Sequence, residues 1–362
     1  MTLPTLSALP PSGALFIRHP VLEEVRLRVI DALTSPRPAP IIAVVGGAGT
    51  GKSTLLDLLH GEALAAEADA MAADPRILPV ARGSVPAPTS GRFDWHAFAD
   101  EVGRAFRMPA RDLAVANGAP VGRRVRGRQA RNAAEALADA AADVRLRGGR
   151  LLFLDEAGHL GVMADQKRSD VQFDALKDFA TEAGIRLVLF GTYDVLKLPH
   201  ASAQLGRRTV VAHLRPYRFE VPRDRAAFRT VVETLAAELA DPLPVEDDWL
   251  AELHAGAAGC IGLLVDWLLN GAHVWRERGA RGPLRAAVRA GAWPAPFLAQ
   301  VRAELVRGAA ILGEAGPPPA RPVAATPAPS PRRAHVRPLT ANGQRLKPGE
   351  ARPRRLPVGV VG

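Results

Sequence analysis

A glycine-rich segment at residues 46–54 has the sequence GGAGTGKST, which fits the pattern G-x-x-x-x-G-K-[ST]. Glycines in this pattern let backbone N–H groups face phosphate oxygens, the lysine reaches the β and γ phosphates, and the hydroxyl after it ligates Mg²⁺. Lys52 and Ser53 occupy those last two positions, and a helix predicted to begin at Lys52 adds the positive end of its dipole. We therefore expect a site for ATP and Mg²⁺ formed by Gly46, Gly47, Ala48, Gly49, Thr50, Gly51, Lys52, Ser53 and Thr54.

Two adjacent carboxylates, Asp155 and Glu156, follow an apolar run at residues 151–154. An aspartate at the end of such a strand holds Mg²⁺ in P-loop proteins, so Asp155 is expected to act together with Ser53. A carboxylate one residue further on is placed to orient and activate the attacking water as a general base, which predicts this role for Glu156. The pair therefore predicts ATP hydrolysis, and a simple acidic loop is the alternative.

Polar residues also follow the apolar run at 185–190. This run ends in a glycine followed by Thr192, which we expect to hydrogen-bond the water or the γ-phosphate; a plain turn is the alternative. We expect this strand and the strand at 151–154 both to lie beside the strand that precedes the P-loop. Arg207 and Arg208 come next, before the run at 210–214. An arginine there can stabilise transition-state charge at a neighbouring subunit's γ-phosphate, and a solvated basic loop is the alternative.

The elements that position these residues alternate along the chain. Short apolar runs rich in branched residues lie at 41–45, 77–81, 151–154, 187–190 and 210–214. Apolar residues recur at helical spacing in 20–33, 52–60, 95–106, 129–146 and 170–183. This alternation predicts an α/β fold, with a five-stranded parallel sheet and helices on both faces. The carboxyl ends of the strands then meet at one edge, where ligands bind in such sheets.

The remainder of the chain has a different character. Helical patterns without strands between them lie at 224–239, 246–254, 261–274, 283–290 and 294–311, which predicts a small all-α domain. From residue 317 onward Pro, Ala and Arg dominate and large apolar residues are sparse, so this tail is predicted to be disordered when alone. The predicted domains are an N-terminal extension with a helix (1–34), an α/β core (35–218), a helical lid (219–315) and a basic tail (316–362).

The composition excludes several classes of protein. The chain has 362 residues, of which 48% are hydrophobic, and a single cysteine. One cysteine allows no intrachain disulfide and argues against a cysteine-ligated metal site. No apolar run reaches the roughly 18 residues of a membrane helix. The first residues also lack a basic region followed by an apolar stretch. We therefore expect a cytoplasmic protein with no membrane partner.

Basic residues are concentrated in two segments. Nine arginines and lysines against one glutamate give residues 317–362 a net charge of +8 out of the chain's +10. Five more arginines lie within nine residues, before the helix that leads to Asp155. Such clusters can neutralise DNA phosphates, and a solvated surface is the alternative for both segments. The expected DNA contacts are Arg123, Arg124, Arg126, Arg128 and Arg131, and the tail is a candidate segment for docking on DNA or a partner protein.

The order of these motifs resembles that of an AAA+ ATPase, and more narrowly the TniB/TnsC group of transposition regulators, over residues 16–311. Besides the P-loop, the resemblance rests on FIRHP (16–20), VPAP (85–88), GRFDW (91–95), LDEAGHL (154–160), LFGT (189–192), QLGRR (204–208) and GCIGLL (259–264). One position departs from the pattern: Leu263 and Leu264 follow Gly262, where many AAA+ proteins have a sensor arginine.

The resemblance implies an ATP-dependent protein that forms a homo-oligomer, a ring or a filament, on double-stranded DNA. It further implies that the protein hands a target site to a DDE-type transposase, with a target-selection protein as a further partner. The strand transfer itself would belong to the transposase. Two alternatives remain open: a helicase-loader or IstB-like AAA+ ATPase, and a nucleotide switch that acts as a scaffold without hydrolysing ATP.

Overall fold

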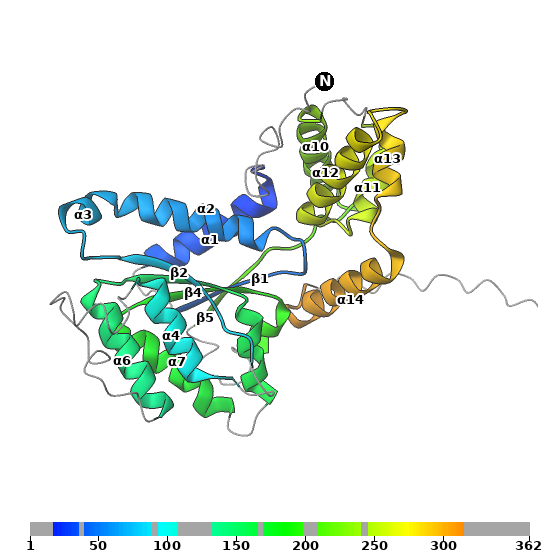
Figure 1. Cartoon of the computed structure of the whole chain (residues 1–362). Coiled ribbons are helices and arrows are strands. Elements are labelled where there is room, and N and C mark those ends of the chain that lie inside the picture. Colours follow the sequence, from blue (N-terminus) through cyan, green and yellow to red (C-terminus); the bar gives the residue numbers. More distant parts are fainter. Residues whose placement is uncertain are drawn as a thin grey trace, which may run out of the picture. The chain divides into compact units, whose positions relative to one another are not determined.

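A computed structural model of the chain describes residues 17–35, 40–88, 93–107, 132–165, 169–197, 209–239 and 245–314. These residues all belong to one compact unit, Met1–Ala315. Figure 1 shows that its first part is an α/β structure and that its later part is built of helices alone. The predicted tail at 316–362 lies outside the described residues.

Five parallel strands form one sheet in the order β2-β3-β4-β1-β5. They are β1 (Ile41–Val45), β2 (Val80–Ser84), β3 (Leu151–Asp155), β4 (Arg186–Gly191) and β5 (Thr209–His213). β1 lies between β4 and β5 and is buried along its whole length. Val45 pairs with Gly191 on one side and with His213 on the other, so the chain leaves these three strands at the same level. The predicted five-stranded parallel sheet is confirmed.

Helices cover both faces of this sheet, as predicted. They are α1 (Pro20–Thr34), α2 (Lys52–Ala66), α3 (Ala68–Ala73), α4 (Trp95–Ala105), α6 (Ala133–Leu146) and α7 (Ser169–Ala183), with 3-10 turns η3 (Ala157–Asp165) and η4 (Tyr193–Leu196). In Figure 1, α1 and α2 lie over one face, and α4, α6 and α7 lie over the other. The apolar residues between the layers make a continuous core that includes Leu55, Phe98 and Phe153.

The strand order corrects one expectation. β3, which ends in Asp155, does not lie beside β1, because β4 pairs with both strands and separates them. Helix α2 spans this gap, since it contacts β2, β3 and β4 on one face of the sheet. The first turn of α2 therefore brings Ser53 to Asp155, although the strands before these two residues are not neighbours.

The second strand is also placed later than predicted, beginning at Val80 rather than at residue 77. Pairing with β3 starts at Val80 and Leu151. Before that, the carbonyl of Pro79 accepts the N–H groups of Arg150 and Leu151 at 2.8 and 3.0 Å, and these bonds belong to no ladder pair of the sheet. β2 is an edge strand whose second half is polar. The apolar run at 77–81 therefore does not coincide with the limits of β2.

The later part of the unit consists of helices, with no strand among its described residues. They are α10 (Pro222–Ala237), α11 (Asp247–Gly256), α12 (Ile261–Glu277), α13 (Leu284–Ala290) and α14 (Ala295–Ile311). From here on we call α10 to α13 the lid, which leaves out α14 of the helical domain predicted at 219–315. Trp249 and Trp267 lie in its core, with 0% and 2% exposure. In the described part of the chain no single helix is long and apolar enough to cross a bilayer. Helices α11 and α12 reach that length and apolar character only when they are taken together, and the chain bends by 108° between them.

Tyr217 joins the start of α1 to the lid. Its hydroxyl lies 3.0 Å from Nδ1 of His19, the N-cap residue of α1, and the same Nδ1 accepts the N–H of Leu22 at 3.3 Å. The N–H of Tyr217 donates to the carbonyl of Gly259 at 2.9 Å, and its carbonyl lies 2.8 Å from Nε2 of His254. His19 is buried, and its neutral ring accepts hydrogen bonds at Nδ1 from the Tyr217 hydroxyl and the N–H of Leu22. Through these two bonds the histidine of the FIRHP stretch contributes to the fold.

The lid also contacts the P-loop directly, through backbone atoms. The N–H groups of Gly262 and Leu263, in the first turn of α12, donate to the carbonyl of Gly49 at 2.7 and 3.3 Å. No side chain caps α12, so this carbonyl satisfies donors that a helix start leaves free. A Cβ on Gly262 would come 2.7 Å from the same carbonyl oxygen, and one on Gly259 would come 2.3 Å from that of Tyr217. Both glycines of the GCIGLL stretch are therefore required by close backbone approach.

Replacing His19 with Asn keeps a helix-capping side chain but removes the titrating group. Burial lowers the pKa of His19 from 6.5 to about 4. The neutral ring therefore stabilises the fold fully above pH 6.5, and this contribution is lost as the pH falls from 6.5 toward 4. Over that interval of pH, urea titrations should show that the free energy of unfolding falls by about 3 kcal/mol more in the wild type than in His19→Asn. The exposed His96→Asn is the control and should follow the wild type; equal slopes for wild type and His19→Asn would refute the assignment.

Gly262→Ala is expected to loosen the lid from the P-loop. The added Cβ meets the Gly49 carbonyl oxygen at 2.7 Å, so α12 must move and both hydrogen bonds lengthen. We expect the free energy of unfolding to fall by about 2 kcal/mol in denaturant titrations. Gly61→Ala is the matched control, because a Cβ there meets nothing within 4 Å and alanine favours the helix by about 0.5 kcal/mol or more. If the two variants were equally stable, α12 would not be held as described.

Candidate functional site

The P-loop leaves β1 and enters α2 through glycines in the left-handed region. Gly49 has a φ of 72° and Gly51 a φ of 98°, which residues with a Cβ rarely adopt. Gly51 is the N-cap of α2 and borders open space, since a Cβ there would meet no atom within 4 Å. Thr50 braces the loop from within, because its Oγ1 donates to the carbonyl of Gly47 at 3.0 Å. The start of α2 is thus left open to a ligand.

Lys52 reaches back over this loop from the first turn of α2. Its Nζ donates to the carbonyls of Gly46 at 2.9 Å and Gly47 at 2.8 Å. Burial lowers the pKa of Lys52, and negative charges oppose that effect, first that of Glu304 and then that of Asp155. An ammonium has three N–H donors and these two carbonyls use two of them. The third donor suits a phosphate oxygen, so Lys52 fits the predicted ligand.

Ser53 and Asp155 approach each other at the edge of the sheet. Ser53 Oγ lies 3.5 Å from Asp155 Oδ2, and Oδ1 of Asp155 accepts the N–H of Glu156 at 2.9 Å, which fixes the carboxylate. One hydroxyl and one carboxylate are the kind of protein ligands that Mg²⁺ combines with waters and substrate phosphates. Among the described residues no group of three or more His, Cys, Asp or Glu can hold a metal ion. A cation bound here by Ser53 and Asp155 would complete its shell with waters and phosphate oxygens.

Glu156 has an unusual backbone for a residue with a Cβ. Its φ is 53°, in the left-handed region, at a cost of about 1–2 kcal/mol. Hydrogen bonds hold this conformation: the Glu156 carbonyl accepts the N–H of His159 at 3.1 Å, and Nδ1 of His159 lies 3.0 Å from the carbonyl of Val85. The Glu156 side chain is exposed at the sheet edge. Strain kept at such a place by its surroundings is typical of functional residues.

Thr192 lies against the segment that carries these carboxylates. A Cβ on Gly158 would come 3.0 Å from Thr192 Oγ1, so the hydroxyl packs beside the start of η3. The structure thus brings Thr192 to the same edge as Asp155 and Glu156. The next residue, Tyr193, carried no sequence signal. Burial raises its pKa, and its hydroxyl lies 3.0 Å from Nε2 of His213, at the end of β5.

Two residues of the helical part also lie at the P-loop, although neither of them was predicted as a site residue. Leu305 of α14 packs on Gly47, where a Cβ would come 2.5 Å from its Cδ2. Cys260, the N-cap of α12, is buried; burial raises the pKa of its thiol to about 12, although the charge of Lys52 opposes this. These contacts arise from tertiary packing, which local sequence patterns do not encode.

The predicted arginines lie outside the described residues. They are Arg123, Arg124, Arg126, Arg128 and Arg131, which come between α4 and α6, and Arg207 and Arg208, which come before β5. The remaining predicted residues at 46–54 all lie in the P-loop and the first turn of α2.

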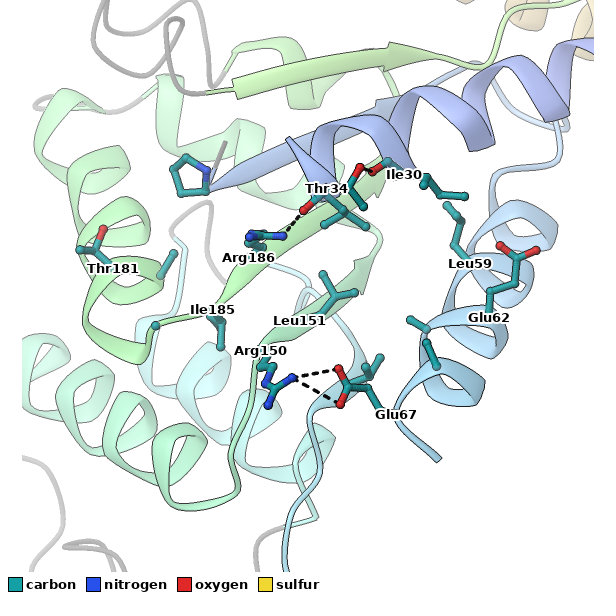
Figure 2. Close-up of a pocket in the computed structure, with 17 residues that line it drawn as sticks. Ile30, Thr34, Leu59, Glu62, Glu67, Arg150, Leu151, Thr181, Ile185 and Arg186 are labelled. Carbon is teal, nitrogen blue, oxygen red and sulfur yellow. Dashed lines mark hydrogen bonds and ion pairs between the residues drawn. The ribbon is translucent and has the colours of Figure 1, made fainter. Parts of the chain in front are cut away.

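A cavity of about 770 Å³ lies at the opposite edge of the sheet (Figure 2). The first residues of β2, β3 and β4 contribute to its lining, namely Val80, Leu151 and Arg186. Figure 2 shows Arg150 turned toward Glu67 inside it, an ion pair of 3.2 Å. Because ligands of parallel sheets bind at the carboxyl ends of strands, this cavity is separate from the predicted site.

Comparison with known proteins agrees with this geometry. Residues 36–198 match the family model described as an AAA domain, and no curated protein matches the sequence. Similar solved structures include the Aeropyrum pernix ORC1 protein in complex with DNA, at 20% identity and a TM-score of 0.46, with 79% of this chain and 65% of that one covered. The Walker-type ATPase of Pyrococcus abyssi is 15% identical with a TM-score of 0.47, and 82% of this chain and 79% of that one are covered.

Domain III of the Thermotoga maritima replication initiation protein DnaA is 16% identical with a TM-score of 0.43, and 79% of this chain and 99% of that one are covered. Of the Aeropyrum pernix ORC1 chain, by contrast, this chain spans 65%, which is less than two thirds. The family match runs from the start of β1 past η4 and so includes the P-loop, Asp155, Glu156 and Thr192. By this sequence match, residues 36–198 carry the P-loop architecture of an AAA domain.

Proposed function

We propose that this chain is an ATPase whose nucleotide state controls its assembly on double-stranded DNA, and that it regulates DNA transposition by recruiting or activating a transposase. The observation that carries the ATPase part is the approach of Ser53 Oγ to Asp155 Oδ2, at 3.5 Å, beside the buried ammonium of Lys52. A serine, an aspartate and a lysine in this arrangement are the residues with which P-loop proteins bind a nucleoside triphosphate and Mg²⁺.

Each residue of the site has a distinct task in hydrolysis. In hydrolysis water would attack the γ-phosphorus of ATP, the bond from that phosphorus to the β,γ-bridging oxygen would break, and ADP would leave. Lys52 would donate to the β and γ phosphate oxygens, and Ser53 and Asp155 would hold the cation, which would neutralise phosphate charge. Glu156 orients the water and takes its proton. Thr192 hydrogen-bonds the water or the γ-phosphate from the end of β4. This set leaves the transition-state charge only partly neutralised, and we assign the rest to Arg207 or Arg208 of a neighbouring subunit.

The transposition part of the proposal rests on the motifs shared with the TniB/TnsC group. The FDW stretch forms the start of α4: Asp94 accepts the N–H groups of His96 and Ala97 at 2.9 and 3.1 Å, and the rings of Phe93 and Trp95 meet edge to face with their centroids 4.9 Å apart. The glycines of the GCIGLL stretch place the lid on the P-loop. These features support a common architecture, from which we infer oligomers on DNA, a transposase partner and a target-selection protein.

Glu156→Gln separates an ATPase from a nucleotide switch that acts as a scaffold. The amide keeps the shape of the carboxylate but cannot take a proton, so we expect kcat to fall by about 10²- to 10⁴-fold with little change in ATP affinity. Phosphate release and binding of a fluorescent ATP analogue measure the two effects. The exposed Glu182→Gln is the matched control and should behave as wild type, whereas Lys52→Ala should lose binding itself. Unchanged turnover in Glu156→Gln would remove the general base from the proposal.

DNA binding is expected to depend on both nucleotide and salt. With a non-hydrolysable ATP analogue the chain should bind duplex DNA at low salt, and affinity should fall steeply as salt rises. The slope of log K against log salt is negative. Replacing the five arginines at 123–131 by glutamine should reduce its magnitude by up to about 4.5 if all of them neutralise phosphates. The matched variant replaces Arg332, Arg333, Arg352, Arg354 and Arg355 of the tail instead. Absence of binding at low salt with the analogue would refute assembly on DNA.

A further inference from the structure

Helix α14 follows the lid in sequence but packs against the nucleotide site. Its buried residues Leu298, Val301, Leu305 and Gly308 recur at helical spacing and form one face. That face meets η4, the turn that follows Thr192. Figure 1 shows α14 running from the lid toward the ends of the central strands. The helix therefore joins the lid to the edge of the sheet where the site lies.

The contacts of this face are close at two points. Leu305 packs on Gly47 of the P-loop, at 2.5 Å from the position of a Cβ on that glycine. Gly308 packs flat on the ring of Tyr193: a Cβ there would come 2.1 to 2.3 Å from three ring carbons. Beyond the helix end, Glu314 Oε2 lies 2.7 Å from Nδ1 of His213, whose Nε2 contacts the Tyr193 hydroxyl. We call the interaction of these residues the α14 docking contact.

The docked helix brings a negative charge into the site. Glu304 lies next to Leu305, and its Oε1 is buried without a hydrogen-bond partner among the described residues. Burial lowers the pKa of Lys52, and of the charges that oppose this effect the largest is that of Glu304, ahead of that of Asp155. The Glu304 side chain is half-buried, and its one buried oxygen is held there at a cost, because the lost hydration of that oxygen is not replaced.

The same helix is tied to the lid from its other side. Nε1 of Trp293, just before α14, donates to the carbonyl of Leu263 at 3.1 Å. An Arg302 guanidinium N–H donates to the carbonyl of Ala255 in α11. Leu263 is the residue whose N–H binds the P-loop carbonyl of Gly49. A change in the position of α14 therefore acts on the lid as well as on the P-loop.

We infer that α14 is a gate in cis, whose docking on Gly47 and Tyr193 competes with the binding of a nucleoside triphosphate. The polyanionic triphosphate draws Lys52 to itself and meets the carboxylate of Glu304 as a like charge, which disfavours the docked helix. By linkage, whatever weakens docking strengthens triphosphate binding, and it does so by the same factor while the docked form predominates. ADP lacks the γ-phosphate, so the competition distinguishes the two nucleotides. The inference rests on the proposed ATP binding and adds to it a control that lies within the chain.

Two variants of the full chain test the gate through affinities for ADP and for a non-hydrolysable ATP analogue. Glu304→Gln removes the charge and keeps the shape, and we expect the ATP analogue to bind about tenfold more tightly, with a smaller change for ADP. Gly308→Ala places a methyl group against the Tyr193 ring while favouring the helix itself. It should strengthen binding of the analogue in the same direction. Exposed Glu277→Gln, on α12, removes an equal charge elsewhere and should leave both affinities unchanged.

Hydrogen–deuterium exchange of residues 295–311 gives a readout that affinity alone does not. In the wild type, the ATP analogue should speed exchange of α14 relative to ADP. Slower exchange with the analogue, or weaker analogue binding in both Glu304→Gln and Gly308→Ala, would overturn the gate and make α14 a fixed wall of the site. Unaltered affinities in both variants would also overturn it. A wild-type chain that binds neither nucleotide would instead refute the proposed function, so the two failures are distinct.

Discussion

The carbonyl of Gly49 accepts the N–H groups that begin α12, and the rest of the site is arranged around this bond. A helix start leaves several N–H groups without partners, and here a P-loop carbonyl serves as the cap because no side chain does so. The bond requires glycine at position 262, and it aims the positive end of the α12 dipole at the loop expected to hold phosphates. A movement of the P-loop at Gly49 consequently changes the hydrogen bonds that hold the start of α12.

The P-loop is held from three directions. β1 and α2 fix its two ends, α12 holds Gly49, and α14 covers Gly47. Tyr217 adds a second tie between lid and core, since it bonds to the N-cap of α1 and to the carbonyl of Gly259. A ligand that alters the loop at either glycine must therefore alter a contact to a helix beyond the α/β core. This is the physical route by which nucleotide state can reach surfaces far from the phosphates.

Much of the site could be predicted because its chemistry is local in sequence. The P-loop residues are consecutive, Asp155 and Glu156 adjoin, and parallel strands bring the residue after each strand to one edge, as for Thr192. The strand order could not be predicted, because apolar runs show where strands are but not which strands pair. For this reason β4 was not expected between β1 and β3.

The surface on which α14 packs could not be predicted from the sequence for the same reason. Its apolar spacing predicted an amphipathic helix, and that helix is present, but the pattern does not name the surface that it covers. Gly308 is informative only in retrospect: a glycine inside a helix is unfavourable, and here the ring of Tyr193 needs its space. The partner residues are separated by the whole lid in sequence, so tertiary packing alone brings them together.

The charges that the helical part brings to Lys52 bear on the proposed contribution of an arginine from a neighbouring subunit. After Gly262, α12 continues with Leu263 and Leu264, so the residues at its start contribute a backbone dipole and no side-chain charge. α14 contributes the carboxylate of Glu304, which is negative. Phosphoryl transfer needs positive charge at the γ-phosphate. With a carboxylate in this place, docking of α14 works against that need, and release of α14 removes the opposing charge. An arginine supplied by an adjacent subunit would then add the missing positive charge only in an assembled state, which links hydrolysis to assembly.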